Sequence, residues 1–534
     1  MYTEYLDYQQ TGYFSKTVLD YLNGVPALDE FYSAPPAASA IGGIIDKKNS
    51  SPVNRIALVQ VLEEQYEAIT ASGGTILPQV RENIAALHGA DTFTVTTGHQ
   101  LNIFTGPLYT IYKILGTIAL ARQLRNEHPD LKIIPLFWMA TEDHDFAEIN
   151  HLNIGDKAIS WKQEDGGAVG RLAIKTLQAT LGQVLSSIGL SPFLHDLERI
   201  CRDAYLKNKN LADATRYLYN ELFGVYGLVI LDGDSPALKK EFIPVISQDI
   251  LGQHSNTLVS ASNKKLESLG YHVQVHPREI NFFYLQAGSR ERIIRDGSGF
   301  KILNSPVRFT EAELQTELNT FPERFSPNVI MRPVYQEIVL PNLAYIGGGA
   351  EVSYWLSIRS TFAFYKVPYP LLLLRNSAML VDEISRSRNQ HLGFQTADLF
   401  KNPREQVKEY VKRSSTKELD LDTELTTLHE LLTAIEHKAA AIDPTLGEST
   451  RAIYARTRNM IEALETKMMK AEREKFDTEM SQIFKINQKL FPNHTLQERV
   501  ENFLPYYARL GPALFDKLLE SFNAFGKQMT VINL

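Results

Sequence analysis

The stretch from Asp91 to Ala140 constrains the fold more than any other part of the chain. It opens with the β-rich run DTFTVT, passes a turn that contains Gly98 and Gly106, and continues with apolar residues at helical spacing. Ile133–Ala140 is then continuously apolar, which is typical of a strand covered on both faces. The order strand, helix, strand predicts a βαβ unit and a parallel sheet.

A second unit of the same kind follows, with a helix predicted at Ala214–Phe223 and a strand at Gly227–Asp232. Residues 161–190 indicate short strands and turns, and residues 272–303 indicate a small antiparallel section with a hairpin turn at Asp296-Gly297. Further strand-like apolar runs are Val329–Leu340, Leu343–Ile346 and Tyr369–Leu374. The predicted fold class is therefore α/β, with segments inserted between the units of the core.

The pattern changes after about residue 402. Apolar residues step by threes and fours from Leu421 to Ile442, Asp443-Pro444 interrupts them, and a second heptad-like series runs from Ile453 to Leu490. This predicts an antiparallel coiled-coil hairpin whose narrow apolar seams pack on each other, on the core or on a second copy. The expected domains are a core at 1–401 with an N-terminal helical region and insertions near 155–210 and 255–325, a hairpin at 402–492, and a helical segment at 493–534 that packs back on the core.

Composition limits the classes of function. The 534 residues carry a net charge of −7 without a basic run, so no nucleic-acid partner is indicated. The apolar runs are too short to span a bilayer and the N-terminus does not resemble a signal peptide, which predicts a cytoplasmic protein without a membrane partner. The single Cys201 excludes an internal disulfide and a thiolate metal cluster.

Polar side chains gather where the first βα turn is predicted. The chain has no P-loop, no Gly-x-Gly-x-x-Gly fingerprint and no His-Glu-x-x-His motif. Backbone N–H groups and the dipole at the start of the following helix would nevertheless suit a phosphate or a carboxylate. An ordinary capped helix is the alternative. Lys113 is a candidate catalytic residue, and the candidate binding residues here are Gly98, His99, Gln100, Thr105, Gly106, Tyr109 and Thr110.

The second strand leads into a cluster of acids beside a histidine. Such groups could bind a substrate ammonium, orient a general base or hold a divalent metal. If the chain is still extended there, Glu142 and His144 share one side. Asp145 and Glu148 also resemble a capping box that opens a short helix, which is a structural role. We favour ligand contact through Asp143 or His144 and predict no metal. The candidates are Glu142, Asp143, His144, Asp145 and Asn150.

Two later segments bring further polar residues to the same predicted edge. Asp232 and Asp234 end a predicted strand, although Asp-Gly also suits a simple turn. A weaker polar set flanks the triplet Gly347–Gly349, which is too short for a dinucleotide fingerprint. That set consists of Arg332, Gln336, Glu337, Asn342, Tyr345 and Glu351. We count Asp232, Asn342 and Gly348 among the candidate binding residues.

Four blocks of sequence make the chain recognisable. They are TTGHQLNIFTGPLYTIYK from Thr96, PLFWMATEDHDFAEINHL from Pro135, FSPNVIMRPVYQEIVLPNLAYIGGGAEVSYW from Phe325, and LQERVENFLPYYARLGPALFDKLLE at Leu496–Glu520. Together they resemble the cysteine ligase family of bacillithiol biosynthesis, and the resemblance covers essentially the whole chain.

The resemblance implies a Rossmann-like, nucleotidylyltransferase-type core with inserted connecting segments and a C-terminal coiled coil that forms a homodimer. It implies the final step of bacillithiol synthesis, which joins the carboxyl group of cysteine to the amine of glucosaminyl-malate. Related folds carry a His-x-Gly-His signature at the first βα turn, whereas this chain has only His99 there. The source of activation stays open between ATP and another activated donor.

Amide formation needs an activated carboxylate and a deprotonated amine. We expect the Gly98–Gly106 turn and Lys113 to hold the anionic leaving group or the substrate carboxylates. Asp143 or Glu142 would hold the cysteine ammonium, with His144 available for proton transfer. The competing interpretations are a nucleotidyl- or phosphotransferase acting on another small acid, and a non-catalytic ligand-binding or assembly protein.

Overall fold

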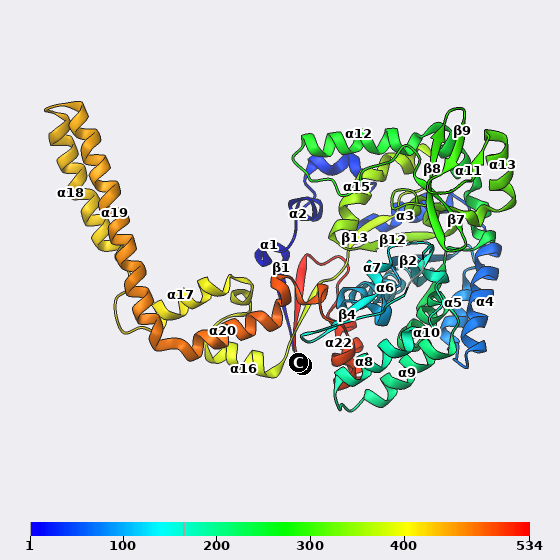
Figure 1. The fold of residues 1–534 in the computed structure, drawn as a ribbon, viewed down its shortest axis with the longest axis horizontal. Helices are drawn as coiled ribbons and strands as arrows, with labels where there is room; N and C mark the ends of the chain where they lie inside the picture. Colours follow the sequence, from blue (N-terminus) through cyan, green and yellow to red (C-terminus); the bar gives the residue numbers. More distant parts are fainter. Residues whose placement is uncertain (1, 164–165) are drawn as a thin grey trace. The chain divides into compact units, whose positions relative to one another are not determined.

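A computed structural model describes residues 2–163 and 166–534 (Figure 1). The chain divides into two compact units. The larger unit contains residues 5–379 and 495–530, and the smaller one contains residues 2–4, 380–494 and 531–534. The chain passes from one unit to the other after His494 and within three strands, which are β1 (Tyr2–Asp7), β14 (Ala378–Val381) and β15 (Gln528–Asn533).

A five-stranded parallel sheet with the order β13-β12-β2-β3-β6 forms the centre of the larger unit. Its strands are β2 (Thr92–His99), β3 (Lys132–Met139), β6 (Val229–Asp232), β12 (Asn342–Gly347) and β13 (Leu371–Leu374). Strands β2 and β3 pair in parallel from Thr92↔Lys132 to His99↔Met139, which confirms the predicted βαβ unit. The chain order reverses between β2 and β12, because β3 and β6 lie on one side of β2 and β12 and β13 on the other. Open α/β sheets bind ligands at such a switch point.

Helices cover the sheet, because its strands are apolar on both faces. Helix α6 (Leu108–Glu127) connects β2 to β3 and packs on both strands. Val95, Leu120, Ile133 and Ile346 belong to one buried cluster between α6, α3 and the sheet. The other helices of this unit are α1 (Tyr8–Thr11), α2 (Lys16–Leu22), α3 (Ile41–Asn49), α4 (Arg55–Ala71), α5 (Pro78–Ala86), α7 (Phe146–Ile149), α8 (Leu177–Ile188), α9 (Leu194–Lys207), α10 (Leu211–Phe223), α11 (Pro236–Gly252), α12 (His254–Ser268), α13 (Glu311–Thr320), α14 (Arg332–Val339), α15 (Gly349–Phe364), α21 (Leu504–Leu510) and α22 (Ala513–Ser521).

A second, antiparallel sheet is formed by the inserted segment, in the order β10-β9-β8-β7-β11. Its strands are β7 (Phe282–Gln286), β8 (Ser289–Asp296), β9 (Gly299–Ile302), β10 (Arg308–Phe309) and β11 (Phe325–Pro327). The antiparallel section predicted at 272–303 is therefore confirmed, including the turn after Asp296. Strands β4 (His151–Ile154) and β5 (Lys157–Ser160) form a separate two-stranded sheet.

Two predicted strand regions contain helices instead. Val329–Leu340 forms α14, whose first turn contains Pro333, a residue suited to that position. Within 161–190 the chain forms α8, which buries Leu177, Leu181 and Val184 at helical spacing. Both predictions are wrong, because short apolar runs do not by themselves distinguish a helix from a strand.

The smaller unit contains the helical hairpin. Helices α18 (Asp422–Ala440) and α19 (Pro444–Arg473) lie side by side in opposite directions (Figure 1). Asp443 begins α19, because its side chain accepts a hydrogen bond from the Thr445 N–H. The continuous second helix predicted up to Leu490 is wrong, since it is interrupted at Glu474–Phe476 and resumes as α20 (Asp477–Leu490).

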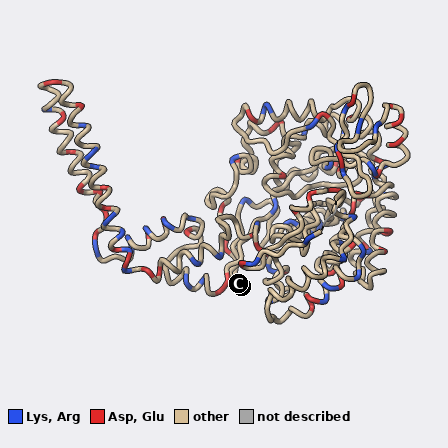
Figure 2. The backbone as a smooth tube through the Cα atoms, viewed as in Figure 1, with Lys and Arg blue, Asp and Glu red and all other residues tan. Residues whose placement is uncertain are grey.

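Charges of both signs are distributed along α18 and α19 (Figure 2), as expected of solvated coiled-coil flanks. Two further helices of the smaller unit are α16 (Glu383–His391) and α17 (Pro403–Ser414). Across the described ranges of both units, no helix is long and apolar enough to cross a membrane.

Candidate functional site

A cavity of about 1040 Å³ opens at the switch point of the parallel sheet. We call it the switch-point pocket. Its floor comes from the ends of β2 and β3, one wall from the N-terminus of α15, and another from the inserted antiparallel sheet. Of the candidate residues, the lining contains Gly98, His99, Gln100, Tyr109, Lys113, Glu142, Asp143, His144 and Gly348.

The adjacent ends of β2 and β3 bring the two main candidate segments together. Gly98 pairs with Trp138, and a side chain on Gly98 would lie 3.1 Å from the Trp138 carbonyl oxygen, so glycine permits this approach. Just beyond the last residue pair of these strands, His99↔Met139, the Gln100 Nε2 donates a hydrogen bond of 2.7 Å to Asp143 Oδ2. The first βα turn and the acid segment therefore line one pocket.

Lys113 is engaged by the protein itself. Its ammonium is 2% exposed, donates to the Gly98 carbonyl oxygen at 2.9 Å and forms an ion pair with Glu351. Burial would raise the pKa of Glu351, but Lys113 together with hydrogen bonds lowers it to about 2. Burial also lowers the pKa of Lys113, an effect that Glu351 opposes. The pair links β2 to the first turn of α15, where Gly348 N–H donates to Glu351.

His99 is a neutral imidazole in this setting. Burial, followed by the charge of Lys113, lowers its pKa to about 3. The ring packs edge-on against Tyr109 with centroids 5.2 Å apart. Within the described ranges its Nε2 atom has no hydrogen-bond partner. A histidine with so low a pKa is unsuited to supplying protons near neutral pH.

The chain leaves the sheet at the end of β3, before the acidic residues Glu142, Asp143 and Asp145. Strand β3 ends at Met139 and the chain turns, so Glu142 and His144 do not alternate along an extended strand as the sequence suggested. Asp145 caps the short helix α7 by accepting from the Glu148 N–H, the structural role that was considered for it. Glu142 and Asp143 are left facing the pocket.

Two cations from distant segments hold these carboxylates. Lys239, on α11, is fully buried and lies 2.5 Å from Glu142 Oε1. Arg290, on β8, is 7% exposed, lies 3.8 Å from Asp143 and 2.9 Å from His144 Nδ1, and stacks on the Phe283 ring. Burial would raise the pKa of Asp143, but hydrogen bonds, among them those from Gln100 and from the His144 backbone N–H, and the charge of Arg290 lower it.

Lys239 and Arg290 were not predicted from the sequence, because neither belongs to a local motif. Arg375 is a third such residue: it lines the pocket beside Gly348, is 5% exposed and donates to Glu498 at 2.6 Å. These side chains reach the pocket only through the packing of elements far apart in sequence. A buried-strand pattern before Arg375 was the only available signal.

Several candidate residues lie outside the pocket lining. Thr105 and Gly106 form a tight turn with positive φ at both, and the Asn502 side chain donates to the Gly106 carbonyl. Asn342 is the buried first residue of β12, where its side chain contacts Thr96 and Glu337. The remaining candidates outside the lining are Thr110, Asp145, Asn150 and Asp232.

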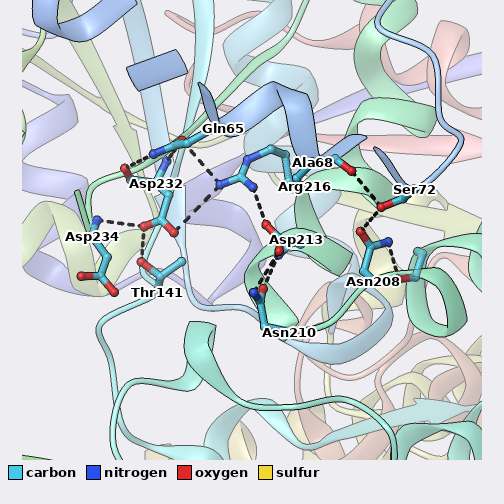
Figure 3. Close-up of polar contacts among 11 residues, drawn as sticks. Gln65, Ala68, Ser72, Thr141, Asn208, Asn210, Asp213, Arg216, Asp232 and Asp234 are labelled. Atoms are coloured by element: carbon cyan, nitrogen blue, oxygen red, sulfur yellow. Dashed lines mark hydrogen bonds and ion pairs between the residues drawn. The ribbon is translucent and has the colours of Figure 1, made fainter. Parts of the chain in front are cut away.

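Asp232 belongs to a separate polar cluster (Figure 3). This cluster lines its own cavity of about 340 Å³. Asp232 accepts a hydrogen bond from the Thr141 hydroxyl and from the Asp234 N–H. Arg171 binds Asp234 through two hydrogen bonds of 2.7 and 2.8 Å, and Arg216 lies between Asp232 and Asp213. Burial and the neighbouring Asp234 raise the pKa of Asp232 to about 6. These charges mostly compensate one another, which indicates a structural role.

The described residues contain no group of three His, Cys, Asp or Glu side chains placed to hold a metal ion. The switch-point pocket instead combines carboxylates, guanidinium groups and a helix N-terminus. A Rossmann-like parallel sheet with such a pocket at its switch point defines a class of proteins that bind small charged metabolites.

Comparison with known families makes this class specific. Residues 1–376 match the family described as bacillithiol biosynthesis BshC, N-terminal Rossmann-like domain, and residues 378–534 match its C-terminal coiled-coil domain. The chain belongs to the bacillithiol biosynthesis BshC family.

Full-length relatives agree with this assignment. The chain is similar to proteins named cysteine ligase BshC, a name that marks the activity as provisional, from three bacteria. These are Flavobacterium psychrophilum (41% identity, 100% of this chain and 99% of the relative), Flavobacterium johnsoniae (38%, 100% of both) and Christiangramia forsetii (38%, 100% and 99%).

Proposed function

We propose that this protein catalyses the final step of bacillithiol synthesis, the joining of the cysteine carboxyl group to the amine of glucosaminyl-malate. The family and the name carried by its relatives support a cysteine ligase. The observation that carries the proposal is that one pocket holds both Asp143, an ionised carboxylate, and Arg332, a cation that forms no ion pair with any carboxylate the structure describes. An ammonium and a substrate carboxylate can therefore bind side by side.

Arg332 is the best-placed anion ligand of the pocket. One of its amino groups donates to Gln336 at 2.8 Å and its guanidinium faces the Tyr345 ring, but no carboxylate lies within 4 Å among the described residues. The N-terminus of α15, at Gly348–Ala350, lines the same wall and favours negative charge through its dipole. We assign the malate carboxylates to Arg332 and this helix end.

Lys113 then acts indirectly. Its ammonium already binds Gly98 and Glu351, so it holds α15 in place beside β2. Asp143, kept ionised by Arg290 and its hydrogen bonds, is the proposed ligand of the cysteine ammonium. ATP or another activated donor would supply the activated carboxyl group.

Thiol analysis of cells that lack the gene tests the reaction. Accumulation of glucosaminyl-malate with no bacillithiol is expected, and re-expression of wild type should restore bacillithiol. The Asp143→Ala and Arg332→Ala variants should not restore it, whereas Lys16→Ala, at an exposed ion pair away from the pocket, serves as the matched control. Normal bacillithiol in the deletion strain would overturn the proposal.

We also propose that two copies of this chain associate through the helical hairpin. Several large apolar side chains on α18 and α19 are exposed in the single chain, although they follow the heptad-like seam. Met460 is 72% exposed and Ile453 is 53% exposed. Burying such a stripe against a second copy removes apolar surface from water, which favours association.

A further inference from the structure

The protonation of His144 is constrained by its neighbour. Arg290 places an amino group 2.9 Å from His144 Nδ1. A guanidinium can only donate hydrogen bonds, so Nδ1 must accept. The single proton of the neutral ring is then on Nε2, and the ring offers a donor to the pocket rather than a base. His144 therefore does not supply the proton acceptor that amide formation needs.

Glu142 has the free acceptor that His144 lacks. Its Oε1 atom is bound to Lys239, while its Oε2 atom accepts no hydrogen bond from the residues that the structure describes. The carboxylate lines the switch-point pocket and its side chain is 13% exposed. One oxygen is thus fixed by the protein and the other is available to a ligand.

Lys239 is placed to control this carboxylate without entering the pocket. Its side chain is fully buried, donates to the Phe325 carbonyl oxygen at 2.7 Å and lies over the Tyr335 ring. Glu142 is the only carboxylate with which it forms an ion pair in the described part of the chain. Burial raises the pKa of Glu142, and the charge of Lys239 opposes that rise.

Asp143 differs from Glu142, because both of its carboxylate oxygens already accept hydrogen bonds. Its Oδ2 accepts from Gln100 and its Oδ1 accepts from the His144 N–H at 2.8 Å. Because these hydrogen bonds lower its pKa, it is a weak proton acceptor but a good ligand for a cation. The two adjacent carboxylates therefore suit different tasks.

We propose that Glu142 is the general base of the reaction and that Lys239 is its positioning residue; this rests on the proposed ligase function. The amine binds after losing one proton to solvent and attacks the carboxyl carbon of a cysteinyl phosphate or adenylate. The N–H proton passes to Glu142 Oε2 as the C–N bond forms. The bond from that carbon to the phosphate oxygen then breaks, and the phosphate leaves with the electron pair.

The test compares the pH dependence of kcat/KM for cysteinyl-amide formation in wild type and four variants. Glu142→Gln should lower kcat by about 10²- to 10⁴-fold, the usual range for losing a general base. Lys239→Met should move the acidic limb of the profile to higher pH by about 1 unit or more, because an opposite charge at this distance is removed. Lys239→Arg should leave the limb near its wild-type position. Lys48→Met, which breaks the buried pair with Glu337 outside the pocket, is the matched control and should not move it.

A folded Lys239→Met protein with an unmoved acidic limb, or Glu142→Gln activity within tenfold of wild type, overturns the assignment. If Lys239→Met does not fold, the Glu142→Gln result decides alone. Infrared difference titration of wild type against Glu142→Gln follows the same carboxyl group without turnover. A wild-type protein that forms no amide, but whose Glu142 titration moves to higher pH in Lys239→Met, refutes the ligase function and leaves the Lys239–Glu142 coupling standing.

Discussion

Replacement of Lys113 by Met should destabilise the larger unit strongly. The Lys113 side chain is 2% exposed and that of Glu351 is 22% exposed, so the substitution leaves a mostly buried carboxylate without its cation. The pKa of Glu351 is about 2 in the folded protein against 4.5 for an unperturbed glutamate. At about 1.4 kcal/mol per pH unit, this difference corresponds to roughly 3 kcal/mol of unfolding free energy. Removal of one partner of a buried pair costs a similar ~3–5 kcal/mol.

Urea unfolding followed by tryptophan fluorescence measures this loss, since Trp138, Trp161 and Trp355 are buried in the same unit. The Lys113→Met/Glu351→Gln double variant should recover most of the stability, because it removes the uncompensated charge as well. Lys16→Met, which breaks the exposed pair with Asp20, is the control and should have little effect.

The Lys113–Glu351 pair also determines how the free energy of unfolding depends on pH. Because the folded pKa of Glu351 is depressed, its contribution is complete above pH 4.5 and is lost as the pH falls towards 2. The difference between wild type and Lys113→Met should therefore be largest near neutral pH and shrink in acid. A loss below about 1 kcal/mol at pH 7, or a double variant no more stable than Lys113→Met, would refute the reasoning.

Three further results are expected. Arg332→Ala should raise KM for glucosaminyl-malate by about 10- to 100-fold, because a charged hydrogen bond contributes roughly 1.5–3 kcal/mol, with Arg332→Lys intermediate in steady-state assays. Ile453→Glu with Met460→Glu should give a monomer in analytical ultracentrifugation; a persistent dimer would contradict the hairpin interface. Asp232→Asn should keep kcat/KM within about twofold, since the residue lies outside the pocket. The pKa of Asp232 is raised to about 6, so the stability of wild type should fall as the pH rises from 4 to 6. The urea unfolding midpoint of Asp232→Asn should not show this decline.

The sequence predicted the part of the fold that depends on local periodicity. β2, α6 and β3 each carry a complete apolar pattern, and their order alone implies parallel pairing. α14 was misassigned because its eight residues are too few for the helical period to outweigh Val and Ile content. The break at Glu474–Phe476 leaves the heptad pattern intact, so no sequence signal marks it.

The same distinction applies to the candidate site. Gly98, Gln100 and Asp143 could be proposed because they follow strands whose ends meet at one edge of a sheet. Lys239 and Arg290 could not, because they lie about 100 and 150 residues after the carboxylates they hold, on a helix and on an inserted strand. The spacing of residues in the sequence does not indicate which buried cation will pair with which carboxylate.

Lys239 and Arg290, the cations that the sequence did not predict, determine which roles the predicted acids and histidine can take. From the sequence, the cysteine ammonium was expected at Asp143 or Glu142, with no choice between the two, and proton transfer at His144. Lys239 fixes one oxygen of Glu142, while Arg290 turns His144 into a donor and keeps Asp143 ionised. Of the two cations that the sequence did indicate, Lys113 is compensated by Glu351, which leaves anion binding to Arg332. The inserted sheet and α11 therefore belong to the chemistry of the pocket, since without their cations the three neighbouring side chains would have no distinct roles.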